Sequence, residues 1–383
     1  MKRALKFLTV FLGTAVVIIG FIIGINYPAF KTLFSNSDGM AEGSEYVKNT
    51  YSLKDLTVFI SEKPEFISIV SFDVNNPDSG IFYQPDISRS MGTTANIFLL
   101  IEYERQVAAG KIDPNESIPY AEIQRLALPE ISEKAHEESF SVLKKKNADS
   151  VLLDKAVAAM IEYNDLAIAD FLWFKLGQNN LMALMDTLDL SNTSLPLPFS
   201  GYYIYIHPDF DDTPNNDAIN SIITQANRYK NDDDYNKTVK TAFREDRLSR
   251  SFIEERNLLK FAPQTTARDM AKLVFGLYHE TLLSPKISRA VKEKLRWPMG
   301  SSPIERSFKD YGAIYDNRMG LLCGIDFGTS IYDGHTSVQA VYFDRLPVAF
   351  WLHMSANHMQ EDYQQRLIWD PALYETTQKA ISK

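Results

Sequence analysis

The sequence contains a single cysteine, Cys323, among 383 residues. One cysteine cannot form an intrachain disulfide, and it also excludes the paired cysteines of common structural zinc sites. The six histidines are scattered, and His353 and His358 stand five residues apart rather than one helical turn apart. From these residues we predict neither a metal site nor a cofactor.

An excess of positive charge is also missing. The chain has 40 lysines and arginines against 49 aspartates and glutamates, and its formal net charge is −9. Because nucleic acids bind to basic surfaces, we expect no nucleic-acid partner. Hydrophobic residues make up 45% of the chain. That content is sufficient for a buried core in one large domain or two small ones.

Charged residues are absent from residues 7–25, which follow a basic leader containing Lys2, Arg3 and Lys6. A helix of about 19 residues spans about 28 Å, close to the hydrocarbon thickness of a bilayer. A cleaved signal peptide is the alternative, but no small-residue cleavage site follows the apolar run. We therefore favour an uncleaved signal anchor in residues 1–27 and a linker in residues 28–45. Positive charges stay inside, which puts a domain of residues 46–383 on the extracytoplasmic side of the cell membrane.

Hydrophobic periodicity gives a coarse map of the domain. Helical spacing predicts helices over residues 46–62, 91–110, 150–163, 165–176, 217–229, 235–248, 265–280, 285–295 and 360–383. Runs rich in β-branched residues predict strands over residues 66–74, 80–83, 312–319, 324–331, 336–342 and 347–355. Residues 192–264 are long and polar, and we treat them as an insertion. Strands at both ends around a helical middle predict an α+β fold, with one antiparallel sheet beside an all-helical lobe.

Several short sequence motifs occur in an order that is typical of one protein superfamily. They are the turn and apolar helix of residues 91–110, Met160-Ile161 before Asn164-Asp165, the helix start QTTARDM at residues 264–270, and Arg318 shortly before Gly320. Together they resemble the class A β-lactamase and penicillin-binding-protein superfamily, whose motifs are Ser-x-x-Lys, Ser-Asp-Asn and Lys-Thr-Gly. The resemblance covers residues 46–383 and implies that family's two-part fold and a cleft for acyl transfer.

The resemblance places Thr93 at the position of the nucleophilic serine and Asn96 at that of the lysine. This register follows from Gly110, which stands fourteen residues after Asn96 at the end of the helix. An asparagine cannot accept a proton at neutral pH, and a hydroxyl is a weak nucleophile without a base. The alternative is that Thr93 only caps the helix.

The second motif aligns with Asn164-Asp165-Leu166, in which only the aspartate is kept. A shift of one residue gives Tyr163-Asn164-Asp165, which is closer to the Tyr-x-Asn variant of related enzymes. In either register, polar side chains could face the cleft. The alternative is that Asn164 or Asp165 simply caps the helix that follows.

The third motif aligns with Arg318-Met319-Gly320, which keeps the cation and the glycine but loses the threonine hydroxyl. Arg318 could hold a substrate carboxylate through two parallel hydrogen bonds, and Gly320 would allow close approach of the backbone. The alternative for Arg318 is a solvated side chain at the end of a strand.

One catalytic element of class A β-lactamases has no counterpart. These enzymes hydrolyse the acyl-enzyme with a glutamate on a loop after the second motif, but residues 190–208 contain no Asp or Glu. Tyr202, Tyr203 and Tyr205 follow in this region. They either line a groove or cover the edge of the sheet, and we favour the sheet edge.

These residues leave open whether the protein is an enzyme. The leading hypothesis is a membrane-anchored β-lactamase-like or penicillin-binding-like domain with impaired acyl transfer, which binds a cell-wall peptide, a β-lactam-like ligand or a protein partner. One alternative is a working β-lactamase or peptidase that uses Thr93 as nucleophile, with a base supplied by Tyr163, Asp165 or the insertion. The other is a structural envelope protein that acts through residues 192–264.

Overall fold

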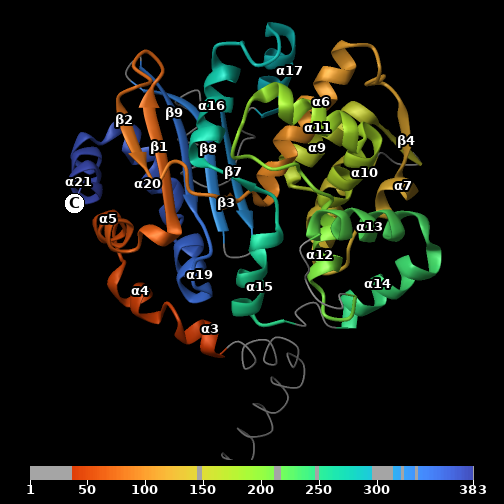
Figure 1. Cartoon of the computed structure of the whole chain (residues 1–383), viewed down its shortest axis with the longest axis horizontal. Coiled ribbons are helices and arrows are strands. Elements are labelled where there is room, and N and C mark those ends of the chain that lie inside the picture. Colours follow the sequence, from red (N-terminus) through yellow and green to blue (C-terminus); the bar gives the residue numbers. More distant parts are fainter. Residues whose placement is uncertain are drawn as a thin grey trace, which may run out of the picture.

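A five-stranded antiparallel sheet forms one part of the molecule, and helices form the rest (Figure 1). The computed structural model describes residues 37–144, 149–210, 217–245, 250–295, 314–320, 323–332 and 335–382, with only the backbone described in the strands of residues 314–332. The strands, in their order across the sheet, are β2 (Gly80–Tyr83), β1 (Ile67–Asp73), β9 (His335–Phe343), β8 (Cys323–Tyr332) and β7 (Ile314–Gly320).

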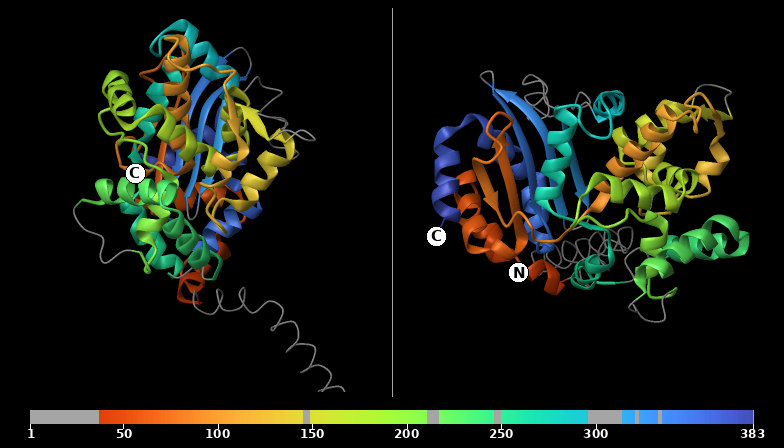
Figure 2. Two further views of the ribbon diagram at one scale, coloured as in Figure 1. Left: turned by 90° about the vertical axis from the view of Figure 1, so that its right-hand side faces the viewer. Right: turned by 45° about the horizontal axis from the view of Figure 1, so that its top comes forward.

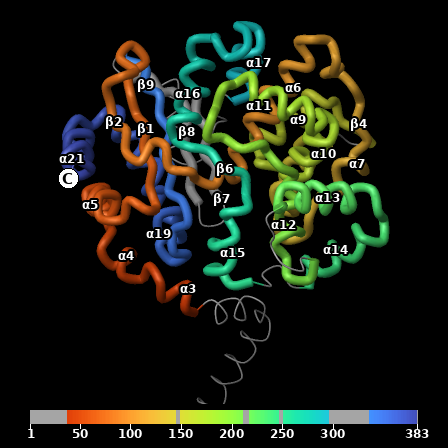
Figure 3. Tube along the Cα trace, in the orientation of Figure 1, coloured from red at the N-terminus to blue at the C-terminus, as the bar shows by residue number. Residues whose placement is uncertain are grey.

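The sheet joins the two ends of the domain. β1 pairs with β9 over its whole length, with Ile67 opposite Phe343 and Asp73 opposite Ser337. This pairing confirms the prediction that the terminal strands meet in one antiparallel sheet. Figure 3 traces both segments to the same part of the molecule.

Helices from both ends of the domain cover the outer face of the sheet (Figures 1 and 2). They are α4 (Ser44–Asn49), α5 (Leu53–Glu62), α19 (Val348–Ala356), α20 (Met359–Trp369) and α21 (Pro371–Ile381), and the short helix α3 (Ser37–Ala41) packs on α19. We call the apolar cluster between these helices and the sheet the outer core. It includes Leu56 of α5, Ile69 of β1 and Val341 of β9.

Three predicted elements in this layer were wrong in type or extent. The predicted strand of residues 347–355 is helix α19, with Phe350 and Met354 buried one turn apart. The predicted closing helix is interrupted at Asp370, because Pro371 cannot continue the ladder of α20 but fits the first turn of α21. The first predicted helix is likewise two helices, α4 and α5, with Ser52 capping the second.

The helical lobe packs against the inner face of the sheet. Its long helices are α6 (Asn96–Ala108), α8 (Glu133–Leu143), α9 (Leu153–Tyr163), α10 (Leu166–Leu176), α11 (Gln178–Leu188), α16 (Ala267–Tyr278) and α17 (Pro285–Leu295), with the short elements α7 (Tyr120–Gln124), β4 (Ser117–Pro119) and β5 (Ser150–Leu152). We call its apolar cluster the inner core. It runs from Leu172 of α10 through α6 to Val70 of β1 and Ala340 of β9.

The insertion of residues 192–264 is built into this lobe. It contains the predicted helices, as α13 (Ala218–Asn231) and α14 (Asp233–Glu245), and also α12 (Phe199–Ile206) and α15 (Phe252–Leu258). Tyr202 and Tyr205 are buried in the inner core, so the expectation that they cover the sheet edge was wrong. The hydroxyl of Tyr229 donates to the carbonyl of Ala127 at 2.9 Å, which ties the insertion to the earlier chain.

The predicted membrane anchor, residues 7–25, lies outside the described residues. Within the part of the chain that the structure describes, no helix has both the length and the apolar character needed to cross a bilayer.

Candidate functional site: the segment before α6

The candidate site begins with a single helical turn that leads into α6. This turn is the 3-10 helix η2 (Gly92–Ala95). Just before it, β3 (Arg89–Ser90) pairs with β6 (Gln264–Thr265), and the Met91 amide donates to the Pro263 carbonyl at 2.7 Å. β7 and β8 run beside η2 on the sheet side. The turn is therefore held between the sheet and the helical lobe.

Thr93 and Asn96 carry the unusual feature of this segment. Asn96 is 0% exposed, and neither its amide nitrogen nor its amide oxygen has a hydrogen-bond partner among the described residues. The buried Thr93 hydroxyl also has none. A buried polar group without a partner loses about 1–3 kcal/mol of hydration. The side chains of β7, which runs beside this turn, lie outside what the structure describes.

The alternative that Thr93 caps the helix was wrong. Neither η2 nor α6 has a side-chain cap, and the hydroxyl that bonds back in this turn is that of Thr94, to the Met91 carbonyl. Thr93 is therefore not occupied by a structural role of this kind.

The second motif forms the corner between α9 and α10. Asn164 has φ 55°, a left-handed conformation that asparagine tolerates well, and its side-chain oxygen is buried without a partner among the described residues. Asp165 caps α10: one carboxylate oxygen accepts from the amides of Ala167 at 2.9 Å and Ile168 at 3.2 Å. The alternative that this residue caps the following helix is therefore confirmed for Asp165.

Two residues that the sequence did not indicate complete this corner. The other oxygen of Asp165 lies 2.9 Å from His136 Nδ1 and accepts from the Ser139 hydroxyl. All three side chains are buried. The spacing of His136, Phe140 and Leu143 on α8 is helical, and it was the one available signal in a stretch that otherwise reads as polar and mixed.

The third motif is placed only through its backbone. Arg318 lies on β7 opposite Ile325, and Gly320 ends that strand opposite Cys323. Since β7 runs beside η2, the strand that carries Arg318 and Gly320 is next to the turn that carries Thr93. The side chain of Arg318 lies outside what the structure describes.

The order of these elements can now be compared with known proteins. Residues 52–317 match the model of the Beta-lactamase enzyme family, Beta-lactamase2. The chain belongs to this family. A comparison with curated protein sequences finds no match.

Solved structures agree with this fold. The β-lactamase of Sphaerobacter thermophilus is 14% identical, with a TM-score of 0.54, and the match covers 84% of this chain and 100% of that one. PBP-A is 14% identical, with a TM-score of 0.50, and the match covers 82% of this chain and 96% of PBP-A. A variant of the reconstructed class A β-lactamase of the last common ancestor of Gram-negative bacteria is 14% identical, with a TM-score of 0.50. That match covers 81% of this chain and 100% of the variant. At this identity the likeness concerns the fold alone.

Within this Beta-lactamase2 domain, a nucleophilic role for Thr93 would need a neighbouring base to activate its hydroxyl. No described group is hydrogen bonded to the Thr93 hydroxyl, and Asn96 carries no basic atom. Both oxygens of Asp165 are engaged with α10, His136 and Ser139. Burial raises the pKa of the Tyr163 hydroxyl above its ordinary value, so this group stays protonated at neutral pH.

Residues 190–208, which contain no Asp or Glu, include α12. α12 begins at Phe199, and its first amides donate to the buried carboxylate of Asp170 on α10, from Phe199 at 2.6 Å and from Ser200 at 2.8 Å. Burial raises the pKa of Asp170 from 3.8 to about 6. This carboxylate fixes the start of α12 and is not free to activate a water.

Proposed function

We propose that this protein is a membrane-anchored, extracytoplasmic domain whose penicillin-binding-like cleft binds a ligand rather than carrying out efficient acyl transfer. One observation carries the proposal: Thr93 and Asn96, at the nucleophile and lysine positions, keep buried polar atoms without partners among the described residues. The ligand we favour is a cell-wall peptide or a β-lactam-like molecule. A protein partner that presents a similar peptide segment could bind in the same way.

Asn96 suits such binding because its amide both donates and accepts. A peptide bond offers the complementary pair, an N–H and a C=O, so one ligand amide could satisfy both atoms of Asn96. The neighbouring strand β7 supports the same proposal, since the strand that carries Arg318 runs beside the turn that carries Thr93. A guanidinium there would suit a peptide carboxylate.

The location of the domain rests on the sequence alone. The apolar residues 7–25 and the basic leader before them favour a single-pass anchor with the domain outside the cytoplasm. That compartment contains the peptide of the cell wall, so the anchor and the proposed ligand are consistent with one another.

The test separates binding from chemistry on the full chain. Wild-type protein, Thr93→Ala and the exposed control Thr187→Ala are each incubated with a fluorescent reporter penicillin. The intact mass of each protein is then measured. We expect no covalent adduct in any of them. A cell-wall peptide with a free carboxylate should bind reversibly, and Asn96→Ala should weaken it about tenfold through the lost buried hydrogen bonds.

The opposite result is equally clear. A penicillin adduct that forms in the wild type and in Thr187→Ala but is lost in Thr93→Ala would establish Thr93 as a working nucleophile. It would replace the binding proposal with the hydrolase alternative. Unchanged peptide affinity in Asn96→Ala would contradict the proposed role of the cleft.

A further inference from the structure

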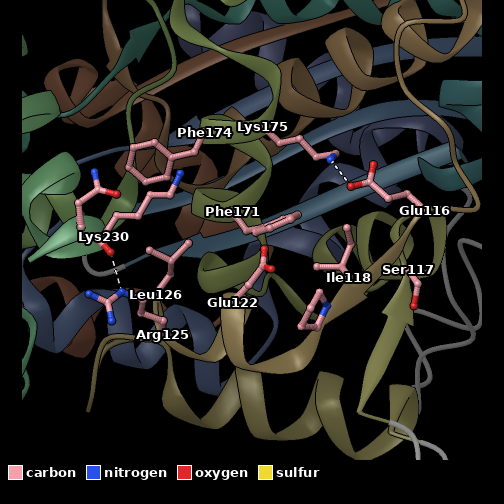
Figure 4. A pocket seen from close by; sticks show the side chains of 12 residues that line it. Glu116, Ser117, Ile118, Glu122, Arg125, Leu126, Phe171, Phe174, Lys175 and Lys230 are labelled. Atoms are coloured by element: carbon pink, nitrogen blue, oxygen red, sulfur yellow. Dashed lines mark hydrogen bonds and ion pairs between the residues drawn. The ribbon is translucent and has the colours of Figure 1, made fainter. Parts of the chain in front are cut away.

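A concave site lies in the helical lobe, and none of the residues that line it belongs to the segment of Thr93 and Asn96. It is a pocket of about 420 Å³, within the usual range for small-ligand sites. Its walls come from β4, α7, α10 and the end of α13, and it shares no lining residue with the three motifs. Figure 1 shows these elements on the side of the lobe farther from the sheet, and Figure 4 shows the pocket itself.

Apolar side chains form the body of the pocket. Phe171 and Phe174 lie three residues apart on α10, so both project from one face of that helix and line the cavity. Ile118 of β4 and Leu126 after α7 are buried beneath it. The two half-buried rings give a ligand side chain an apolar surface to cover (Figure 4).

Two of the three cations around this surface are already neutralised. Lys175 forms an ion pair with Glu116 at 2.7 Å, and Arg125 forms one with Asp233 at 2.6 Å. Arg125 also donates to the backbone carbonyl of Lys230 at 2.5 Å, which fixes the end of α13. Arg125 therefore acts on Lys230 by holding its backbone in place.

Lys230 and Glu122 are the charges left for a ligand. The ammonium group of Lys230 lies 4.4 Å from the centre of the Phe174 ring, and no carboxylate within the described ranges forms an ion pair with it. Glu122 lines the same pocket and is exposed, also without an ion-pair partner there. Figure 4 shows Lys230 beside Phe174 and Glu122 beside Phe171.

We propose that this pocket binds a short apolar peptide in its zwitterionic form. The peptide carboxylate pairs with Lys230, its ammonium group faces Glu122, and its apolar side chain covers Phe171 and Phe174. A ligand with a single charge would leave one of the two pocket charges without a partner, so it binds less tightly. This site is independent of the function proposed for the cleft at Thr93.

The experiment compares three probes on the full chain by calorimetric titration: the dipeptide Ala-Phe, its N-acetyl derivative and its C-terminal amide. Wild-type protein should bind Ala-Phe about fivefold more tightly than either derivative, as expected for one charge-assisted contact at each end. Lys230→Gln should remove the difference between Ala-Phe and the amide. Glu122→Gln should remove the difference between Ala-Phe and the acetylated probe.

Lys237→Gln on the exposed face of α14 is the matched control, and it should leave each dissociation constant within about twofold. Both lysines are replaced by the same uncharged residue, so the two variants can be compared directly. Circular dichroism checks that each variant is folded. The proposal is overturned if wild-type protein binds none of the probes at millimolar concentration. It is also overturned if Lys230→Gln and Lys237→Gln change binding alike, or if a singly charged probe is preferred.

Discussion

At the scale of single residues, two aspartates cap helices with the same pattern of hydrogen bonds but in different surroundings. Asp165 accepts from the amides two and three residues ahead in α10, and Asp370 does the same for α21, at 3.0 and 3.2 Å. Asp165 is fully buried and also holds His136 and Ser139, whereas the capping contacts of Asp370 are near the surface. The pair allows the contribution of the buried contacts to be measured.

We expect Asp370→Ala to lower the free energy of unfolding by about 1 kcal/mol, the usual effect of losing an N-cap. Asp165→Ala should lower it by about 3 kcal/mol or more, because the imidazole and the hydroxyl lose their buried acceptor as well. Denaturant unfolding of both variants gives the two values. Equal losses would mean that His136 and Ser139 contribute nothing through Asp165.

We expect the buried carboxylate of Asp170 to make the stability of the chain depend on pH. Its pKa in the folded protein, about 6, lies above the ordinary value of 3.8 because burial disfavours the charged form. The folded state therefore binds the proton more tightly than the unfolded state. This group's contribution to stability is complete below about pH 4 and is lost as the pH rises through 6, by about 3 kcal/mol in total.

The measurement is the stability of wild type relative to Asp170→Asn between pH 4 and 7. The other carboxylates titrate in both proteins, so their effects cancel in the difference. The wild type should lose stability relative to the variant across this window and then level off. A flat difference would show that Asp170 titrates normally in the folded state.

Sequence reasoning reached some of these residues and not others, for physical reasons. The capping role of Asp165 was predictable because a cap depends on neighbours two and three residues away. The roles of Thr93 and Thr94 were not, because two adjacent threonines offer the same hydroxyl and only the local backbone decides which one bonds to Met91. The contact of His136 with Asp165 joins separate helices, and no local pattern encodes it.

At the scale of elements, locally determined features were predicted well. Strands β1, β2, β8 and β9 and helices α10, α13, α16 and α17 fall within a few residues of their predicted ranges. The error at α19 arose because its sequence, VAFWLHMSA, is apolar on nearly all sides and shows neither a two-residue nor a 3.6-residue period. What decides its structure is the layer of helices it joins over the outer core.

Two glycines inside helices test how tightly these elements pack. A Cβ on Gly201 of α12 would lie 2.3 Å from the Ile222 carbonyl oxygen and 2.9 Å from the Ala226 Cβ, both on α13. A Cβ on Gly276 of α16 would meet nothing nearer than 3.7 Å. The absence of a side chain is therefore required at Gly201 and is incidental at Gly276.

We expect Gly276→Ala to raise the free energy of unfolding by about 0.5–1 kcal/mol, because alanine favours the helix. Gly201→Ala gains the same preference but should be destabilised on balance by about 1–2 kcal/mol, since α12 and α13 must move apart. Thermal unfolding of the two variants decides the matter. If both changes stabilise the protein, the close contact of α12 with α13 does not constrain the fold.

At the scale of the whole molecule, the two cores share the central strands. Val70 of β1 and Ala340 of β9 belong to the inner core, while their neighbours Ile69 and Val341 belong to the outer core. Because strand side chains alternate between faces, neither core can be lost without disrupting the packing of the other. The long insertion belongs to the inner core too, so its deletion would not isolate a function, and substitutions on exposed faces are the better probe.

We therefore expect the helical lobe and the sheet to unfold together. Leu172→Ala in α10 and Leu56→Ala in α5 remove the same atoms from fully buried positions of the inner and the outer core. Each should lower the free energy of unfolding by about 2–5 kcal/mol, and each should raise hydrogen exchange in the helical lobe and in the sheet alike. If Leu56→Ala loosens only the sheet and leaves exchange in α10 unchanged, the lobes are separate folding units. The shared strands then do not couple them.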